Sequence, residues 1–212
     1  MKKVLIESQY LPSVAYFALI TQADYVVIER CEFFEKQTFR NRCQIQTANK
    51  ELDLSVPVNH QGRKIIIDKL TIDYIQKWQN THWRSIQSAY KNAPFFEYYS
   101  NPIQELIYSN TNSLFELNNQ LLTICLKFLQ IDTPIDFSEK YDKKVESGVF
   151  DARSMIHPKK NLSSLAWFSA SPYYQIFGKD FVKNLSILDL LFNEGPMALA
   201  VLKSSIVIKE NY

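Results

Sequence analysis

The order of three short apolar segments near the N-terminus constrains the fold most strongly. Residues 2–8 (KKVLIES) and 24–31 (DYVVIERC) are β-branched runs of the kind found in buried strands. Between them, residues 14–23 (VAYFALITQA) carry apolar side chains at helical spacing. This strand–helix–strand order predicts a right-handed parallel β-α-β unit. The loop at residues 8–13 follows the first strand, at the edge where parallel sheets bind ligands.

The next part of the chain predicts a β-meander. Three runs read as strands separated by the turn sequences ANKE and NHQGR: residues 37–47 (QTFRNRCQIQT), 52–58 (LDLSVPV) and 64–72 (KIIIDKLTI). Pro57 places the second run at a sheet edge or at a strand end. Together with the first unit, these strands predict a mixed sheet.

From Asp73 onward the apolar period becomes helical. We expect four helices: residues 73–93 with Asp73 as N-cap, 94–109 interrupted at Pro102, 113–131 capped by Asn112 or Ser113, and 181–194 ending near Gly195. Residues 132–164 are polar and rich in structure breakers, and predict a long loop with at most one short strand. The fold class is therefore α/β or α+β, with a β-α-β start and a mainly helical C-terminal half.

Composition excludes several classes of protein. The 24 basic and 22 acidic residues leave a net charge of +2, which argues against a nucleic-acid-binding surface. No apolar run reaches the length of about 18 residues that a transmembrane helix needs. Three widely spaced cysteines favour free thiols in a reducing compartment, and we expect the cytoplasm. Neither a glycine-rich phosphate loop nor a paired metal-ligand spacing occurs, so no cofactor or metal is implied.

His82 is the candidate acid/base. It lies in the sequence NTHWRSIQSAY, with Arg84 beside it as a cation that could face a phosphate. The alternative is a helix histidine that bridges the core and the surface. A second histidine, His157, lies in a basic loop with Lys159 and Lys160 that could close over an anionic ligand, or could simply be solvated.

The strand at residues 37–47 raises a question of its own. Strict alternation places Arg40 and Arg42 on one face, where two guanidinium groups could bind a phosphate or carboxylate, or could pair with nearby glutamates. Asn41 then lies on the apolar face. It could cap a neighbouring loop, sit at a bulge, or line a pocket. We expect Asn41 and Arg42 to meet a ligand through a local irregularity, with Arg40 the more dispensable arginine.

Polar residues also flank the two strands of the first unit. Gln9 and Tyr10 follow the first strand, and Gln9 could hydrogen-bond a polar ligand or merely belong to the connection. Asp24 precedes the second strand and reads most simply as a turn or capping residue, whereas Glu29 ends that strand, where a site is expected. Asp189, four residues before Asn193, shares a helix face with it.

Several segments together resemble the WbqC-like family of bacterial proteins: SQYLPSVAYFALITQADYVVIE, TFRNRCQI, LSVPV, HWRSIQSAYKNAPFFEYY and NLSILDLLFNEGP. They run from the first strand to the last long helix, and imply a single WbqC-like domain over residues 1–212, β-rich over 1–72 and helical over 73–212. The family pattern carries Gln-Pro before the tyrosine. Here no proline adjoins Gln9, so the geometry of that turn is not carried over.

The resemblance implies a role connected with bacterial O-antigen and surface-polysaccharide gene clusters. Its motif positions fall on six residues already considered: Gln9, Tyr10, Asp24, Asn41, Arg42 and His82. We expect an enzyme, with transferase as the candidate class, that takes an anionic small molecule such as a nucleotide-sugar or acyl-type donor. Arg40, Arg42 and Arg84 would hold the anionic group. The alternative is a non-catalytic binding or scaffold protein of the same pathway, with residues 94–109 as its partner surface.

Overall fold

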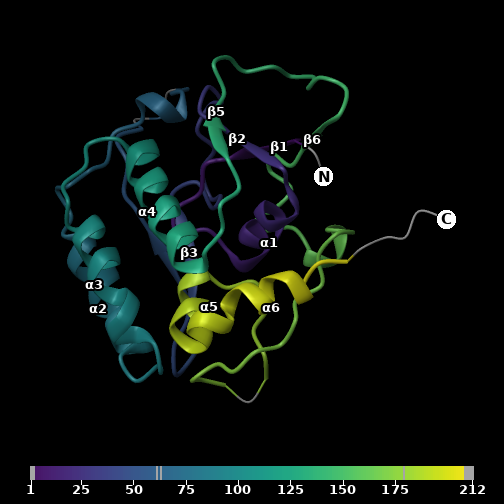
Figure 1. The fold of residues 1–212 in the computed structure, drawn as a ribbon. Coiled ribbons are helices and arrows are strands. Elements are labelled where there is room, and N and C mark those ends of the chain that lie inside the picture. The colour runs from purple at the N-terminus through teal and green to yellow at the C-terminus, as the bar shows by residue number, and fades with distance from the viewer. Residues whose placement is uncertain (1–2, 61, 63, 179, 208–212) are drawn as a thin grey trace.

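The computed structural model describes residues 3–60, 62, 64–178 and 180–207. Lys2, at the start of the expected first strand, lies outside these residues, as do Gln61 and Arg63 in the expected second turn. Figure 1 shows a parallel sheet on one side of the molecule and the helices α2, α3 and α4 on the other.

The N-terminal β-α-β unit is confirmed. Strand β1 (Lys3–Glu7) leads through helix α1 (Val14–Gln22) to strand β2 (Tyr25–Glu29). The two strands pair in parallel, with Glu7 and Glu29 in register at their carboxyl ends. Both strands bury their alternate apolar residues against α1, which is itself buried over its first two turns.

Two short strands from the long polar segment complete the parallel sheet. Strand β5 (Ile135–Phe137) pairs with β2, and β6 (Val149–Asp151) pairs with β1, which gives the order β5-β2-β1-β6. The sequence led us to expect at most one strand here. Each strand has only three residues, too few for an alternation to be recognised. Strands β2 and β6 lie on opposite sides of β1, so the strand order reverses at β1.

The expected meander is only partly formed. Strands β3 (Arg42–Gln46) and β4 (Glu51–Ser55) form an antiparallel pair, so parallel and antiparallel strands lie in two sheets. The third strand, expected at residues 64–72, is wrong, because the segment forms a 3-10 turn at Ile67–Lys69 with isolated bridges on either side. Ile67 and Leu70 are both buried at a spacing of three, which is the 3-10 period.

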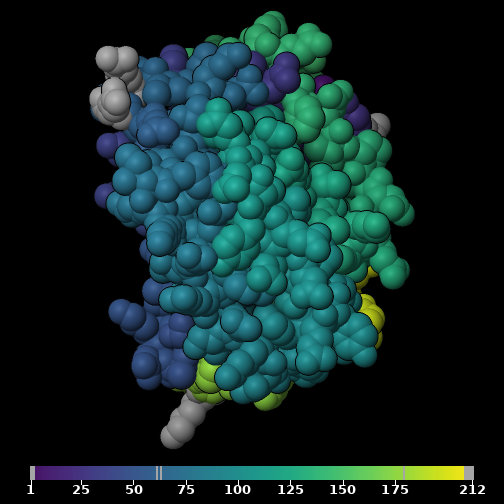
Figure 2. Space-filling model, turned by 90° about the vertical axis from the view of Figure 1, so that its left-hand side faces the viewer, coloured from purple at the N-terminus to yellow at the C-terminus, as the bar shows by residue number. Residues whose placement is uncertain are grey.

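The helical half follows the expected order, but the expectation that Asp73 caps its first helix is wrong, because that helix begins only at Trp78. Its helices are α2 (Trp78–Tyr90), α3 (Phe96–Ile107), α4 (Leu114–Leu129), α5 (Ile187–Glu194) and α6 (Ala198–Ser204), with 3-10 turns at Leu162–Ser164 and Gly195–Met197. Ser113 caps α4, because its hydroxyl accepts a hydrogen bond from the Glu116 amide. The expected interruption at Pro102 is wrong, since α3 continues through it. Figure 2 shows the face that α2, α3 and α4 form side by side.

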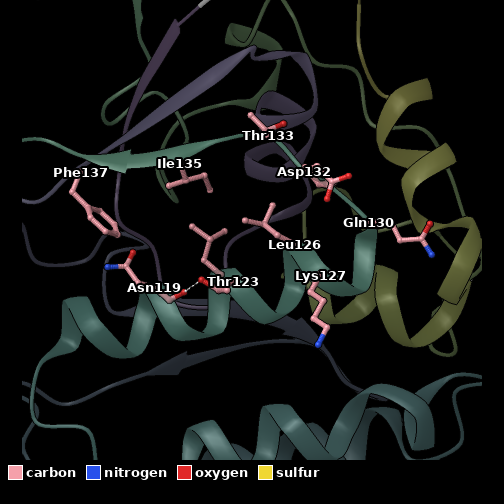
Figure 3. A pocket seen from close by; sticks show the side chains of 11 residues that line it. Asn119, Thr123, Leu126, Lys127, Gln130, Asp132, Thr133, Ile135 and Phe137 are labelled. Carbon is pink, nitrogen blue, oxygen red and sulfur yellow. Dashed lines mark hydrogen bonds between the residues drawn. The ribbon is translucent and has the colours of Figure 1, made fainter.

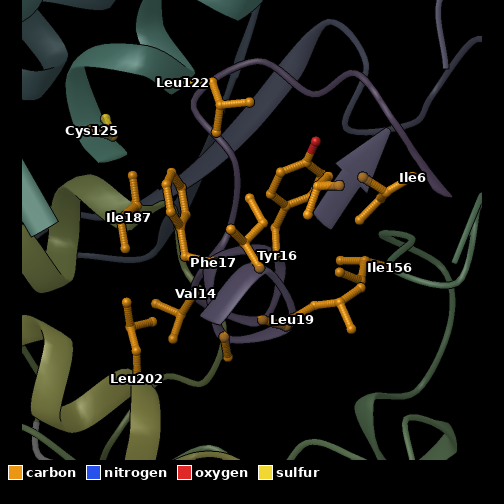
Figure 4. Packing of buried hydrophobic residues seen from close by; sticks show 14 of the residues in the cluster. Ile6, Val14, Tyr16, Phe17, Leu19, Leu122, Cys125, Ile156, Ile187 and Leu202 are labelled. Carbon is orange, nitrogen blue, oxygen red and sulfur yellow. The ribbon is translucent and has the colours of Figure 1, made fainter. Parts of the chain in front are cut away.

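Two apolar clusters fill the interior. The first surrounds α1, and Figure 4 shows Phe17 and Val14 meeting Ile187 and Leu202 of the C-terminal helices. The second lies between the β3–β4 pair and helices α2 to α5, and includes Tyr10. The loop after β1 therefore passes between the two clusters, and its polar residues are drawn into the interior. No helix of the described residues is long and apolar enough to cross a membrane.

Candidate functional site

Acidic residues mark the carboxyl ends of three neighbouring parallel strands. Glu7 ends β1, Glu29 ends β2 and Asp151 ends β6. Parallel pairing brings these ends to one edge of the sheet, beside the point where strand order reverses. Glu7 and Glu29 are each only 1% exposed. Burying ionised carboxylates is costly unless they are paired or hydrogen-bonded. The hydrogen-bond and ion-pair partners of Glu7 and Glu29 therefore determine which chemistry this edge of the sheet can support.

Arg153 connects two of these strand ends. Its Nη1 lies 3.1 Å from Glu29 Oε2, while its Nε and Nη2 lie 2.9 Å and 2.8 Å from the two Asp151 oxygens. Glu29 also accepts hydrogen bonds from the Cys31 amide and the Ser138 hydroxyl. The Arg153 guanidinium holds the pKa of Asp151 below its usual value. The carboxyl group of Glu29 therefore lies against a guanidinium that Asp151 holds in place.

Glu7 is held by neutral donors. Gln9 Nε2 donates to Glu7 Oε1 at 2.7 Å, and the Ser154 amide donates to Oε2 at 2.8 Å. Gln9 is itself buried, and its Oε1 has no hydrogen-bond partner among the described residues. Because an unpaired buried acceptor costs on the order of 1–3 kcal/mol, this oxygen favours a ligand or a water that can donate to it.

Arg40 and Glu32 form a buried pair next to Glu7. The guanidinium donates from Nε and Nη2 to the two Glu32 oxygens, each at 2.7 Å, and Nη2 also contacts the Ser154 hydroxyl at 3.1 Å. Burial raises the pKa of Glu32, although Arg40 opposes that shift. The carboxyl-end cluster thus has six charged members, four carboxyl groups against two guanidinium groups: Glu7, Glu29, Glu32, Asp151, Arg40 and Arg153.

A groove of about 310 Å³ leads to this cluster from outside. It lies on the face of the sheet that points away from α1, where Leu5 and Val27 form part of its floor. Glu29 lines the groove, and the crossing segment from Ser138 to Glu146 forms its far wall. The volume falls within the range of small-molecule pockets. Glu29 is therefore the member of the cluster that a small molecule in this groove can reach.

Basic side chains stand above the same edge of the sheet. Lys160 Nζ donates to the Ser154 carbonyl at 2.8 Å, and Lys159 Nζ donates to Gln37 Oε1 at 2.7 Å. Partial burial lowers the pKa of His157 in the same loop, although the nearby Glu35 carboxylate opposes the shift. Residues 153–160 thus cover Glu7 and Gln9. Lys159 and Lys160 are exposed to solvent and form a basic rim above the buried carboxyl groups of this edge.

His82 lies in a different place, between α2 and β4. Its Nδ1 accepts from the Tyr10 hydroxyl at 3.0 Å, and its Nε2 donates to the Ser55 carbonyl at 3.2 Å. Burial lowers the pKa of His82 to about 4, so the imidazole is neutral at pH 7. Both ring nitrogens have partners, and Tyr10 is fully buried behind the ring. In this geometry the side chain positions Tyr10 and the end of β4.

The remaining predicted residues lie apart from the carboxyl-end cluster. Strand β3 begins only at Arg42, after a turn, so the expectation that Arg40 and Arg42 share a strand face is wrong. Arg42 pairs with Asp53 at 3.3 Å on the hairpin surface. Asn41 donates from Nδ2 to the Val56 carbonyl at 2.8 Å. It therefore caps a neighbouring segment, which is one of the three roles considered for it. Asp24 and Arg84 are exposed.

The structure thus brings Gln9 and Arg40 together around Ser154, and brings Tyr10 and His82 together elsewhere. Sequence reasoning missed Glu7, although it ends β1 just as Glu29 ends β2, and the same rule would have found it. It also missed Asn118 of α4, whose amide donates to the Ser8 hydroxyl at 3.1 Å and to the Arg40 carbonyl at 2.8 Å. No sequence pattern distinguishes that asparagine from its neighbour Asn119.

A wider hollow of about 630 Å³ lies between α4 and β5. Figure 3 shows Asn119 and Thr123 on the helix near Ile135 and Phe137 of the strand, whereas the Lys127 side chain points away from the strand. None of the buried charged groups of the carboxyl-end cluster lines it. No group of three or more potential metal-ligating side chains occurs in the part of the chain that the structure describes.

Comparison with known proteins places the chain in a family. The model of the WbqC-like protein family matches residues 7–161 and 150–201, which include the cluster and the basic loop. The chain belongs to the WbqC-like family. One relative, the "Uncharacterized protein Rv1507c" of Mycobacterium tuberculosis, is 30% identical over 223 residues, covering 93% of this chain and 96% of the relative. No solved structure matches the chain.

Proposed function

We propose that this WbqC-like protein is an enzyme of bacterial surface-glycan biosynthesis, a transferase that uses a nucleotide-sugar or acyl-type donor. The observation that carries the proposal is the convergence of Glu7, Glu29 and Asp151 at the carboxyl ends of three parallel strands, next to the reversal of strand order. Ligand sites of open α/β sheets lie at that position. The biosynthetic context comes from the family resemblance.

The two layers of charge fit the two substrates of a transferase. The basic rim at Lys159 and Lys160 suits the anionic part of a donor, and cations of this kind stabilise developing negative charge. The acidic interior suits an acceptor that presents a hydroxyl or amine. Glu29 lines the groove and would receive the hydrogen of that group, once the acceptor displaces the Ser138 hydroxyl that donates to it. Arg40 is already satisfied by Glu32, so we assign it to holding the site together.

The acid/base role expected of His82 stays a prediction. Both ring nitrogens are engaged, and the carboxyl-end cluster has no contact with the ring among the hydrogen bonds of the described residues. A catalytic role would require the Ser55 hydrogen bond to open. We therefore place the reacting groups of the proposed transferase at the carboxyl-end cluster.

A ligand panel tests the proposal. The melting temperature of the chain would be measured with nucleotide sugars, acyl donors and the corresponding free nucleotides. A ligand that binds the folded state raises that temperature by mass action. We expect at least one donor class to do so, and Glu29→Gln to abolish the shift. Glu105→Gln, an exposed glutamate on α3, is the matched control. A panel without a shift, or a shift indifferent to Glu29→Gln, contradicts the proposal.

One observation favours the second candidate, a non-catalytic binding protein. Tyr98 on α3 is 76% exposed and lies beside Phe95, so an aromatic surface is available to a partner. In a host that depends on the protein for its surface polysaccharide, Tyr98→Ala and Glu29→Gln would separate the two readings. The enzyme requires Glu29 and tolerates Tyr98→Ala, whereas the binding protein shows the opposite pattern.

A further inference from the structure

The outer edge of strand β4 carries unused backbone hydrogen-bonding groups. The Val56 amide donates to the Asn41 carbonyl and the Thr47 amide to the Lys50 carbonyl, which fixes the register. In an antiparallel pair, residues alternate between facing the partner strand and facing away. Glu51, Asp53 and Ser55 therefore direct their amides and carbonyls away from β3. Among these amides and carbonyls, only the Ser55 carbonyl has a hydrogen-bond partner in the described residues, and that partner is the His82 ring.

The two edges of the hairpin differ. The outer edge of β3 is covered, because Gln44 accepts from the Ser186 amide and the Gln46 amide donates to the Tyr90 hydroxyl. Glu51, Asp53 and Ser55 are exposed, so the edge of β4 meets solvent. Natural sheets usually cover or blunt such an edge, and an edge left open is a template for another strand.

A helix runs along this open edge and makes it a groove. Four consecutive residues of β4, from Leu52 to Ser55, line one wall, and α2 supplies the other with Trp78, Thr81, His82 and Ser85. Those helix positions recur every three or four residues, so they form one face of α2. The groove has a volume of about 340 Å³. The bond from His82 to Ser55 closes one end and leaves the stretch from Asp53 to Glu51 open.

Two donors at this groove lack acceptors. Trp78 is only 4% exposed and lines the groove, yet its indole Nε1 has no hydrogen-bond partner among the described residues. Lys77, the preceding residue, also lines the groove, is exposed and has no ion-pair partner there. Of the two carboxylates on the β4 edge, Asp53 is paired with Arg42 and Glu51 is not part of the groove lining. The neighbouring pair of donors, one of them a cation, is therefore complementary to a carboxylate.

We propose that this groove binds an extended, acidic peptide segment of a partner protein. The peptide adds to the open edge of β4 as a third strand, and its carboxylate meets Lys77 and Trp78. Strand addition beside a helix is an established mode of peptide recognition, in which backbone pairing gives affinity and pockets give specificity. This binding site is separate from the carboxyl-end cluster, and gives His82 the role of positioning the end of β4.

The test begins with a phage-displayed library of random linear peptides, selected on the full chain. A peptide from the selection is then synthesised, and its dissociation constant is measured by fluorescence polarisation. We expect the selected sequences to be enriched in Asp and Glu. On binding, hydrogen exchange should slow at the Asp53 and Ser55 amides. A peptide that protects other amides, or a selection that yields no binder, overturns the proposal.

Matched variants locate the contact. Asp53→Pro removes an amide that faces away from β3, so the hairpin can tolerate it, and peptide binding should weaken by about tenfold or more. Asp53→Asn keeps the amide and should bind within about twofold of wild type, whereas equal affinity in both variants counts against strand addition. Lys77→Glu should lose the preference for acidic peptides, while Lys91→Glu, on the exposed C-terminal end of the same helix, should keep it.

A second copy of the chain is the competing occupant of the edge. Sedimentation of the protein alone decides this point. A monomer that binds the selected peptide supports the proposal. A dimer that the peptide dissociates, and that Asp53→Pro also dissociates, would show that this edge pairs with another copy and would overturn the proposal in favour of self-association.

Discussion

At the scale of the residue, Arg40 and Arg42 lie two positions apart and occupy opposite environments. Arg40 is 2% exposed and forms two bonds to Glu32, whereas Arg42 meets Asp53 on the surface. The sequence pattern predicts the same environment for both arginines, since both flank Asn41 in an alternating run. A turn before β3 separates them, and only tertiary packing of that turn against Ser154 decides which arginine is buried.

The two arginines should therefore differ sharply in their contribution to stability. Arg40→Met removes the partner of a buried carboxylate, so we expect the free energy of unfolding to fall by about 3 kcal/mol or more. Arg42→Met removes a surface ion pair and should cost less than about 1 kcal/mol. Urea denaturation of both variants measures the difference. Equal losses would mean that the Glu32 pair is not held as the structure describes.

His82 makes stability depend on pH. The pKa of His82 is about 4 in the folded chain, against the usual histidine value of 6.5. Between these values the unfolded chain binds a proton that the folded chain does not, so stability rises with pH. The contribution is complete above pH 6.5 and is lost as the pH falls toward 4. Burial of the ring is the main cause.

Replacing His82 isolates this effect from other titrating groups. From pH 7 to pH 4 we expect wild type to lose about 3 kcal/mol more unfolding free energy than His82→Gln. The raised pKa values of Glu32 and Asp189 act in the opposite direction, but they are common to both proteins. Urea titrations at several pH values measure the difference. Parallel pH profiles for the two proteins would rule out a depressed histidine pKa.

At the scale of the element, sequence reasoning succeeded where local chemistry is decisive. Ser113, one of the two expected caps, marks the start of α4, and the β-branched runs mark β1 and β2. It failed where an element depends on its neighbours. Strands β5 and β6 have three residues each, and they exist because β1 and β2 offer them edges to pair with. Strand β6 includes Asp151 and leads directly to Arg153, so two of the six members of the carboxyl-end cluster were hidden with it.

Helix α3 is the opposite case. Local preference predicts a break at Pro102, but the helix continues through it. The proline ring cannot supply the amide that an interior helical position needs. Packing of Phe96, Ile103 and Ile107 in the second apolar cluster maintains the helix. Pro102→Ala restores a donor toward the Tyr98 carbonyl, so we expect it to stabilise the chain by about 1–3 kcal/mol. Thermal unfolding monitored by circular dichroism measures this gain, and a lower melting temperature would refute it.

At the scale of the whole molecule, the family-matched residues enclose one polar interior between two apolar clusters. The loop after β1, the turn before β3 and the segment after β6 meet there. Gln9 and the Ser154 amide both donate hydrogen bonds to Glu7, and Arg40 donates one to the Ser154 hydroxyl. Because these three segments are far apart in the chain, no window of sequence contains the site. The parallel sheet and α4 create it, and a groove at Glu29 opens it to solvent.

The most direct test of this account is amide chemical-shift mapping of the isotope-labelled chain with the donor-class ligand that most raises its melting temperature. We predict that the largest perturbations fall at Gln9, Glu29, Arg153 and Ser154, around the carboxyl ends of β1, β2 and β6. Perturbations confined to the hollow between α4 and β5, with the cluster amides unchanged, would contradict the central claim that the buried cluster is the ligand site.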